Sequence, residues 1–328
     1  MVLAGKRVAG KEYSKRRYTL AWLLGLTFGL YFLTTIPVFA QCAVTGSNVA
    51  YGSVNLVTGS PATTTGNINI NCPGGLGSFP YLWACISIGV GTNSVSVNNR
   101  TMKSGANSLA YQLYTDSAYT NIYPFSPPNQ FSIPYSNTTG ANANSTVYAR
   151  IVSGQTTVPP GAYTDSYSGV SQSLVTGNAA PTLPGNCGGG SIPFSFTVSA
   201  TVVASCVVSG NTLNFGTAGV LIANVDATST VSATCSYTTP YNIGLSVGSG
   251  AGATVAVRKM TSGAKTINYS LYTNSGRTTL WGNTIGVDAL SGTGAGTGQN
   301  LTVYGRVPPQ TTPAPGAFSD TIVITVTY

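Results

Sequence analysis

One stretch of this chain occurs twice, and this repeat limits the possible folds more than any other feature of the sequence. Met102–Thr115 reads MKSGANSLAYQLYT, and Met260–Thr273 reads MTSGAKTINYSLYT, with Met, Ser-Gly-Ala, Tyr and Leu-Tyr-Thr at the same spacings. Two flanking pairs of segments also match in order: Val147–Arg150 with Val303–Arg306, and Pro160–Asp165 with Pro315–Asp320. Matches that keep one order over most of both halves indicate a duplicated domain rather than an array of short repeats.

The composition favours an all-β protein. Only 6% of the 328 residues are charged, while Gly and Tyr are abundant. Short alternating segments bounded by Gly, Asn, Pro and Ser predict strands, for example Leu109–Leu113 in the first half and Leu213–Phe215 in the second. No stretch after Ala40 carries apolar residues at the helical period. We therefore predict two antiparallel β-sandwich domains, at residues 41–190 and 191–328.

The formal net charge of +8 overstates how basic the mature protein would be. Six of the 14 basic residues and one of the six acidic residues lie before Tyr18. The remaining eight basic and five acidic residues give a net charge of +3, and they form no basic stripe that would bind a phosphate backbone. Nucleic acid is therefore not an expected partner.

The N-terminus predicts export. A basic segment that ends at Arg17 precedes an apolar run over Tyr18–Phe39, and Val38–Ala40 supplies the small residues of a cleavage site. We expect cleavage after Ala40, which makes residues 1–40 a signal peptide. The alternative is an uncleaved membrane anchor, because the apolar run is nearly long enough to span a bilayer.

Six cysteines in an exported chain indicate disulfides. Sequence alone permits 15 connectivities, and the duplication narrows them. Cys42–Cys72 and Cys206–Cys235 occupy matching places in the two halves, so we expect both pairs to form. Cys85 and Cys187 remain for a further bridge in the first domain. Because the chain has no His and no closely spaced pair of cysteines, a metal site is not expected.

Catalytic chemistry is not predicted. The sequence has no His, and the chain after Ala40 has no Glu and only dispersed Asp residues, so it cannot assemble a catalytic triad or a pair of catalytic carboxylates. Gly244–Gly248 matches a G-x-S-x-G pattern, but its Ser alternates with apolar residues as the polar face of a strand. Asp165 and Asp320 lie beside equivalent Pro-Gly turns, which favours a turn or register role. We predict a protein that is not an enzyme and needs no cofactor.

Two regions differ between the halves, and there we expect the separate task of the first domain. Ile122–Tyr135 and Gly74–Trp83 are rich in proline, glycine and aromatic residues, so we predict loops. Their apolar side chains either cap the core or form an exposed contact surface. The candidate adhesive residues are Phe79, Tyr81, Leu82, Trp83, Tyr123, Phe125, Phe131, Ile133 and Tyr135.

Phe194–Val202 carries the cleanest alternation in the chain, with apolar residues at every second position against Ser and Thr. The segment is either the first strand of the second domain or a strand that completes the sheet of the first domain. The sequence leaves both alternatives open.

The second half closely resembles the spore coat protein U domain. The shared marks run in order over nearly all of residues 206–328: Cys206-Val-Val-Ser, Leu213-Asn-Phe-Gly216, Cys235, Arg258-Lys-Met260, Tyr269-Ser-Leu-Tyr272, Trp281-Gly282, Val303-Tyr-Gly-Arg306, Pro315-Gly316, Asp320 and the final Val-Thr-Tyr. The first half resembles the same domain less fully, since it lacks a clear Trp-Gly match and carries extra cysteines. Members of this family include subunits of archaic, Csu-type chaperone–usher pili, and a two-domain member looks like the tip adhesin.

This resemblance implies immunoglobulin-like sandwiches and a mechanism of assembly. Such pilins lack the last strand of the sandwich, which leaves an apolar groove and an open edge. A periplasmic chaperone fills the groove by strand addition, and the N-terminal extension of the next subunit later replaces it. By resemblance, the last strand of the second domain borders this groove, and the C-terminal residue anchors the chaperone. The residues expected on that strand are Ile322, Ile324, Val326 and Tyr328.

The same resemblance suggests a place at the end of a fibre. If cleavage follows Ala40, only Gln41 precedes Cys42, so the chain would accept a donor strand but offer none. We expect an adhesive tip subunit, exported through the periplasm to the surface of a Gram-negative bacterium, that promotes attachment and biofilm formation. Its expected partners are a periplasmic chaperone, an outer-membrane usher, the next pilin subunit, and an apolar surface or host receptor. The alternatives are a structural coat or outer-surface protein, and a carbohydrate-binding module in which Trp83 and tyrosines stack on sugars.

Overall fold

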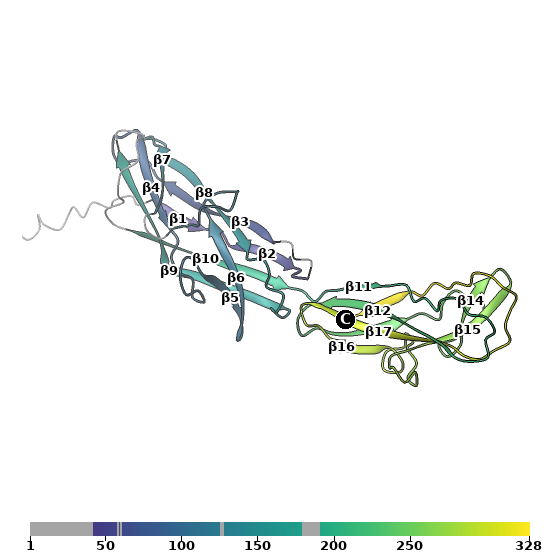
Figure 1. The fold of residues 1–328 in the computed structure, drawn as a ribbon. Helices are drawn as coiled ribbons and strands as arrows, with labels where there is room; N and C mark the ends of the chain where they lie inside the picture. Colours follow the sequence, from purple (N-terminus) through teal and green to yellow (C-terminus); the bar gives the residue numbers. More distant parts are fainter. Residues whose placement is uncertain (1–41, 58, 60, 125–127, 179–190) are drawn as a thin grey trace, which may run out of the picture. The chain divides into compact units, whose positions relative to one another are not determined.

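The computed structural model describes residues 42–57, 59, 61–124, 128–178 and 191–328. These residues contain strands and connecting segments but no helix, which confirms the predicted all-β class. Accordingly, none of them forms a helix of the length and apolarity that crossing a membrane would need. The strands build two β-sandwiches in chain order (Figure 1). The predicted signal peptide, residues 1–40, lies outside the described residues.

The described residues of the first sandwich form ten strands. Their bounds are β1 Ala43–Gly46, β2 Val49–Val54, β3 Thr63–Cys72, β4 Tyr81–Ser87, β5 Arg100–Ser104, β6 Asn107–Tyr114, β7 Asn129–Pro134, β8 Ala141–Ile151, β9 Gly161–Asn178 and β10 Ile192–Val202.

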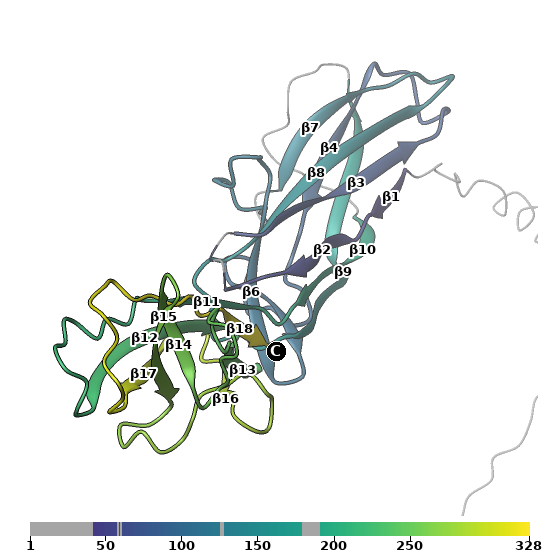
Figure 2. The ribbon, with the colours of Figure 1, turned by 90° about the vertical axis from the view of Figure 1, so that its right-hand side faces the viewer.

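Two layers of strands enclose the core of the first sandwich (Figure 2). One layer has the order β1-β3-β8-β6-β5, and the other has the order β7-β4-β9-β10-β2. The layers join where Lys103 on β5 pairs with Thr164 on β9. Alternation explains the burial, since every second residue of β3 from Gly66 to Cys72 is buried while its neighbours are exposed.

The second sandwich contains eight strands in two sheets. Their bounds are β11 Cys206–Gly210, β12 Val225–Cys235, β13 Pro240–Leu245, β14 Arg258–Ser262, β15 Lys265–Tyr272, β16 Leu290–Thr293, β17 Gly298–Val307 and β18 Ile324–Thr327. The larger sheet has the order β11-β12-β17-β15-β14, and the smaller one has the order β16-β13-β18. Trp281 is fully buried between them and donates its indole N–H to the carbonyl oxygen of Ile243 at 2.8 Å.

A buried arginine in each sandwich relates the two copies residue by residue. Arg258 donates to the carbonyl oxygens of Leu245 and Trp281, at 3.2 and 2.6 Å. Arg100 donates to the carbonyl oxygens of Ile88 and Tyr123, at 3.0 and 3.3 Å. Ile88 therefore corresponds to Leu245, and Tyr123 to Trp281. On this correspondence β4 matches β13 and β9 matches β18.

Two segments predicted as loops are partly strands, and this prediction was wrong. β7 lies within the Pro-rich segment 122–135 and pairs with β4, which itself begins at Tyr81. Pro134 is tolerated because it is the last residue of β7, for which β4 is the partner among the described strands. The second sandwich repeats the arrangement, with β16 at the edge beside β13.

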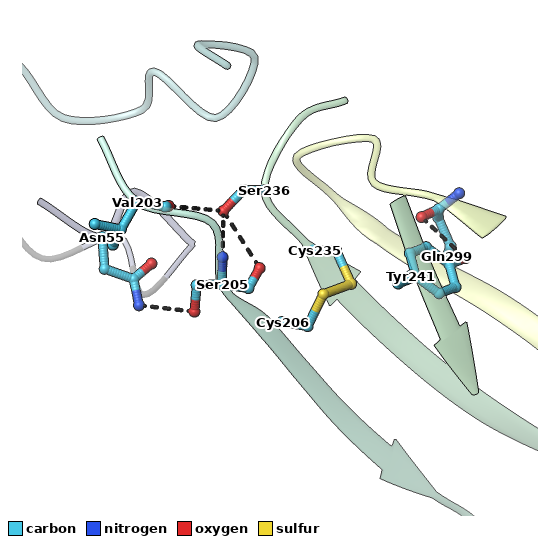
Figure 3. Close-up of a disulfide and its surroundings, with 8 residues drawn as sticks. All are labelled: Asn55, Val203, Ser205, Cys206, Cys235, Ser236, Tyr241 and Gln299. Carbon is cyan, nitrogen blue, oxygen red and sulfur yellow. Dashed lines mark hydrogen bonds between the residues drawn. A yellow bond between two sulfur atoms is a disulfide. The ribbon is translucent and has the colours of Figure 1, made fainter. Parts of the chain in front are cut away.

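The two disulfides predicted from the duplication are confirmed. Cys42 bonds to Cys72, and Cys206 bonds to Cys235. Each therefore clamps the start of the first strand of a sandwich to its neighbour. In Figure 3, the hydroxyl of Ser236 beside the second disulfide accepts a hydrogen bond from the amide of Ser205 at 3.0 Å, which fixes the chain just before β11.

The third predicted bridge lies partly beyond the region that the structure describes. Cys85 is buried on β4 and is disulfide-bonded. Cys187 lies outside the described residues, so the pairing of Cys85 with Cys187 stays a prediction.

Candidate functional site: an open groove in the second sandwich

β10 completes the first sandwich. It pairs antiparallel with β9 from Ile192 to Val202 and parallel with β2 on its other edge. The apolar residues of its alternating pattern all enter the core of this sandwich: Phe194, Phe196, Val198, Ala200 and Val202. The two alternatives left by the sequence are thus resolved by hydrogen bonding, because β10 is a strand of the first sheet.

No described strand takes this place in the second sandwich. There β18, the match of β9, pairs with β13 alone. Leu213 follows Cys206 at the spacing at which Val49 follows Cys42, so the segment from Leu213 corresponds to β2. This segment forms no strand, which corrects the prediction for Leu213–Phe215. The reason is that β2 is held by β10 alone, and a strand without a partner has no ladder.

A groove runs along the gap. It consists of two adjoining hollows of about 500 and about 810 Å³ that share Leu213, Phe215, Met260 and Phe318 in their walls. Further apolar lining residues are Val231, Leu245, Leu271, Ile322 and Ile324 in the first hollow, and Val225, Ile267 and Val307 in the second. An apolar slot next to unpaired backbone is a site for an added strand.

Residues along the groove are more exposed than their matches in the first sandwich. Tyr163, Asp165 and Tyr167 on β9 are buried. Their matches in the aligned Pro-Gly segment, Phe318 and Asp320, are only half-buried, as is Ile322. In the first sandwich β10 pairs alongside these three β9 residues and covers them. The lack of a matching strand beside β18 therefore accounts for the difference in exposure.

A tyrosine–aspartate pair fixes the rim of the groove. Asp320 accepts hydrogen bonds from the hydroxyl of Tyr269 at 2.7 Å and from the amide of Ser249 at 2.7 Å. Burial, and next the bond to Asp320, raise the pKa of Tyr269 far above its usual range, so the phenol stays neutral and donates. Asp165 makes matching bonds to Tyr111 and Asn93. Each aspartate therefore holds a loop that is distant in sequence rather than the Pro-Gly turn beside it.

Of the predicted edge residues, Ile324 and Val326 lie on β18, Ile322 lies just before it and Tyr328 follows its last residue. Ile322, Ile324 and Val326 are half-buried and pack against the core, and the first two line the groove. Tyr328 is 57% exposed, so the end of the strand is accessible to a partner.

Four of the candidate adhesive residues are core residues, so that part of the prediction was wrong. Leu82, Tyr123, Ile133 and Tyr135 are buried. Leu82 and Ile133 face each other across β4 and β7 and point inward with the rest of the core, so they fit the capping alternative. Phe125 lies outside the described residues.

The other four candidates are half-buried. Phe79 stacks on Tyr135 with ring centroids 5.0 Å apart, and Phe131 packs against the core. Tyr81 and Trp83 alternate along β4 with the buried Leu82, so they lie on the opposite, outer face of this strand.

The buried arginines were not predicted to have a role. Arg100 and Arg258 are both 0% exposed, although arginine is almost never fully buried. The signal that could have found them is their repetition, since each lies two residues before the methionine of the repeated stretch. Among the described residues, no group of His, Cys, Asp and Glu could hold a metal ion.

An ion pair on the surface of the second sandwich should contribute little to the free energy of unfolding. Arg306 binds Asp226 through two hydrogen bonds of 2.7 Å, and Arg277 lies 3.3 Å from the same carboxylate. About a third of the Asp226 side chain is exposed (34%), so solvent screens the attraction. Asp226→Asn is expected to lower the free energy of unfolding by less than about 1 kcal/mol. Thermal unfolding at low and high salt checks this.

The pH dependence of that pair has a definite sign. The hydrogen bond from Arg306, and then the charge of Arg277, hold the pKa of Asp226 below its ordinary value of 3.8. A carboxyl group with a lower pKa in the folded state stabilises the fold above the unfolded pKa. This contribution should disappear as the pH falls below about 3.8, and Asp226→Asn should remove that part of the acid sensitivity. A loss of several kcal/mol at pH 7 would contradict the expectation.

The sequence of the chain is similar to those of known proteins. The model of the Spore Coat Protein U domain matches residues 30–168 and again residues 192–325. Protein U of Myxococcus xanthus is 36% identical over 131 residues, which is 36% of this chain and 73% of that protein.

A solved structure shares the fold. The crystal structure of the CsuC-CsuE chaperone–tip adhesion subunit pre-assembly complex, from archaic chaperone–usher Csu pili of Acinetobacter baumannii, aligns with a TM-score of 0.55 at 18% identity. The alignment covers 88% of this chain and 100% of that chain.

Proposed function

Because the chain belongs to the Spore Coat Protein U domain family, we propose that it is the adhesive tip subunit of a chaperone–usher pilus. The observation that carries this proposal is the contrast between the two sandwiches. The first is filled by β10, whereas the second keeps an apolar groove beside β18. A groove of this kind needs an extended segment from another chain.

The family match and the strand pairing support a particular organisation of the chain for this role. By sequence, β10 begins the second family repeat, which starts at residue 192. By hydrogen bonding, it belongs to the first sandwich. The predicted boundary at residues 190 and 191 thus separates the repeats but not the sandwiches. The chain resembles two successive pilins joined covalently, with the leading segment of the second donated to the first.

The proposed partners follow from the remaining groove. A periplasmic chaperone first occupies it, and the leading segment of the next subunit replaces the chaperone at an outer-membrane usher. The relative of this fold was crystallised in a chaperone–tip adhesion subunit complex, which supports a chaperone as the first partner. The proposed location is the pilus tip on the surface of a Gram-negative bacterium, where attachment would promote biofilm formation.

Co-expression tests this function. Residues 41–328 are produced with candidate periplasmic chaperones, and the chaperone is purified through its tag. A stable one-to-one complex is expected, together with aggregation of the chain when it is expressed alone. Ile322→Asp places a charge in the groove and should abolish the complex, while Val323→Asp, at an exposed neighbour, should preserve it. A soluble monomer without a chaperone would instead favour a free-standing coat or surface protein.

The proposed adhesive surface is the outer face of β4, with Tyr81 and Trp83. These aromatic side chains on a rigid strand can bury apolar area against a surface at about 25 cal/mol per Å², and many fibres would multiply the effect. Trp83→Ala is expected to weaken binding of the purified complex to polystyrene by about tenfold, which corresponds to about 1.4 kcal/mol.

Two comparisons make the adhesion test specific. Tyr237→Ala removes an exposed aromatic side chain from the second sandwich and should leave binding unchanged. Competition by a soluble sugar, with no sensitivity to mild detergent, would favour the carbohydrate-binding module over the apolar adhesin. Equal binding by both variants and the parent would show that another surface carries adhesion.

A further inference from the structure

The first sandwich is an internal template for the segment that fills the second groove. β10 occupies in the first copy the place that is open in the second, and both copies share the buried arginine, the Tyr–Asp pair and the disulfide. The register of β10 can therefore be transferred to β18 by matched residues. This step rests on the proposed function, because it concerns the partner of the same groove.

Matched positions show that the open edge of the second sandwich, along β18, lacks a register irregularity that β9 has in the first sandwich. In the first sandwich, Val198 pairs with Asp165 and Ile192 pairs with Ser173. Ile192 and Val198 are thus six positions apart on β10, whereas their partners are eight positions apart on β9, and the register shifts between Phe194 and Phe196.

The corresponding edge of the second sandwich is two residues shorter. Ile86 pairs with Ser173, and its match Ile243 pairs with Val326. Val326 therefore corresponds to Ser173. Asp320 and Val326 are six positions apart, which equals the separation of Ile192 and Val198 on β10. A regular strand without a bulge fits this edge.

The space for side chains also differs. In the first sandwich Phe196 stacks on Tyr167 at 4.5 Å and lies over Gly46, where an added Cβ would come within 3.1 Å of the Phe196 Cβ. In the second sandwich the residue at the Tyr167 position is Ile322. The match of Gly46 is Gly210, and a Cβ there would overlap the Cδ1 atom of Ile324. The side chain of Ile324 thus fills the space that an aromatic donor residue would need.

From these two differences we infer that the groove selects an unbulged donor segment with an aliphatic, not aromatic, residue opposite Ile322. The donor comes from another subunit and runs antiparallel to β18. Its inward residues are opposite Asp320, Ile322, Ile324 and Val326, at every second position. An aromatic residue opposite Ile322 clashes with Ile324, whereas alanine or valine fits.

Donor segments fused to the chain test the choice of side chain. A linker as long as residues 179–191 and a copy of Ile192–Val202 are added after Tyr328. In one version the copy is unchanged, and in the other it carries Phe196→Ala. With Trp83→Phe in the chain, Trp281 fluorescence reports unfolding of the second sandwich. The alanine copy is expected to give a Tm about 5–10 °C higher than the phenylalanine copy.

A compensating substitution in the groove tests whether Ile324 causes the higher Tm of the alanine copy. Since Val326 corresponds to Ser173, Ile324 corresponds to Ser171, which is buried in the first sandwich. Ile324→Ser restores this smaller residue, so it should remove the advantage of the alanine copy. If the phenylalanine copy stabilises the unchanged groove at least as well, the inference on side-chain size is wrong while the groove keeps its function. If neither copy changes solubility or Tm relative to the unextended chain, the proposed function fails and the inference fails with it.

Cysteine cross-linking tests the register directly. Thr325→Cys is combined with a cysteine in the fused copy, placed at the position of either Pro193 or Ser195. If the donor strand is unbulged, Thr325→Cys lies opposite the position of Pro193. With the bulge of the first sandwich it would instead face the position of Ser195. A disulfide to the Pro193 position, detected by mass spectrometry, is the expected result, and preferential cross-linking to the Ser195 position would overturn the inferred register.

Discussion

Val198→Asp is expected to unfold the first sandwich and leave the second one folded. Val198 is 0% exposed at the centre of β10 and pairs with Asp165, which is itself buried. The substitution removes a buried apolar side chain and places a second carboxylate beside the buried one of Asp165. The expected loss in the free energy of unfolding is at least about 4 kcal/mol, which is a large part of the stability of a domain.

The tryptophans allow the two sandwiches to be followed separately. After removal of residues 1–40, Trp83 is in the first sandwich and Trp281 is in the second. In the chaperone-bound chain with Trp281→Phe, Val198→Asp should abolish or strongly lower the cooperative transition of Trp83. Ser195→Asp, at an exposed position of the same strand, should change that transition by less than about 1 kcal/mol.

The opposite outcome would reassign β10. A second chain with Trp83→Phe in place of Trp281→Phe follows Trp281. If Val198→Asp eliminates the transition of Trp281 in that chain while the transition of Trp83 persists in the chain with Trp281→Phe, β10 stabilises the second sandwich rather than the first. The result would also remove the template from which the donor register is derived. The experiment therefore tests the observation on which the functional argument depends.

The duplication made much of the fold predictable from sequence. It fixed two disulfides by position, and alternation such as that of Leu109–Leu113 located strands that the structure contains. These features are local or are set by matched spacing, so no knowledge of the packing was needed.

Which strands pair with each other could not be predicted in the same way. Val49–Val54 and the segment from Leu213 correspond in sequence, yet the first is a strand and the second is not. The difference lies in the partner, because β10 is present in one case and absent in the other. A strand is a property of two segments, so one sequence window does not determine it. The same limit applies to Leu82 and Ile133, whose burial follows from the pairing of β4 with β7.

The open groove therefore has a simple physical origin. The second sandwich has the same buried arginine and Tyr–Asp pair as the first, but no described strand takes the place of β10 between β18 and the segment from Leu213. Apolar area and backbone groups that β10 covers in the first copy stay uncovered. The free energy that would complete the second fold is thus available for binding a segment of another chain.

Arg258→Leu is expected to destabilise the second sandwich by about 4 kcal/mol. The guanidinium group is 0% exposed and donates to four carbonyl oxygens, those of Leu245, Ser246, Val255 and Trp281. Leucine fills similar space but donates no hydrogen bond. Each buried acceptor left without a donor costs about 1–3 kcal/mol, so even partial relaxation leaves a large loss.

The neighbouring lysine provides the matched control. Lys259 is next to Arg258 on β14 but makes only an exposed hydrogen bond to the carbonyl oxygen of Ala251, so Lys259→Leu should cost less than about 1 kcal/mol. Both variants are compared in the chaperone-bound chain by the fluorescence of Trp281 during denaturation. Arg258→Leu should shift the transition strongly and reduce the yield of the complex. Equal stability of the two variants would mean that water or backbone movement satisfies the four carbonyl groups, and the arginine would then not be what holds this end of the second sandwich together.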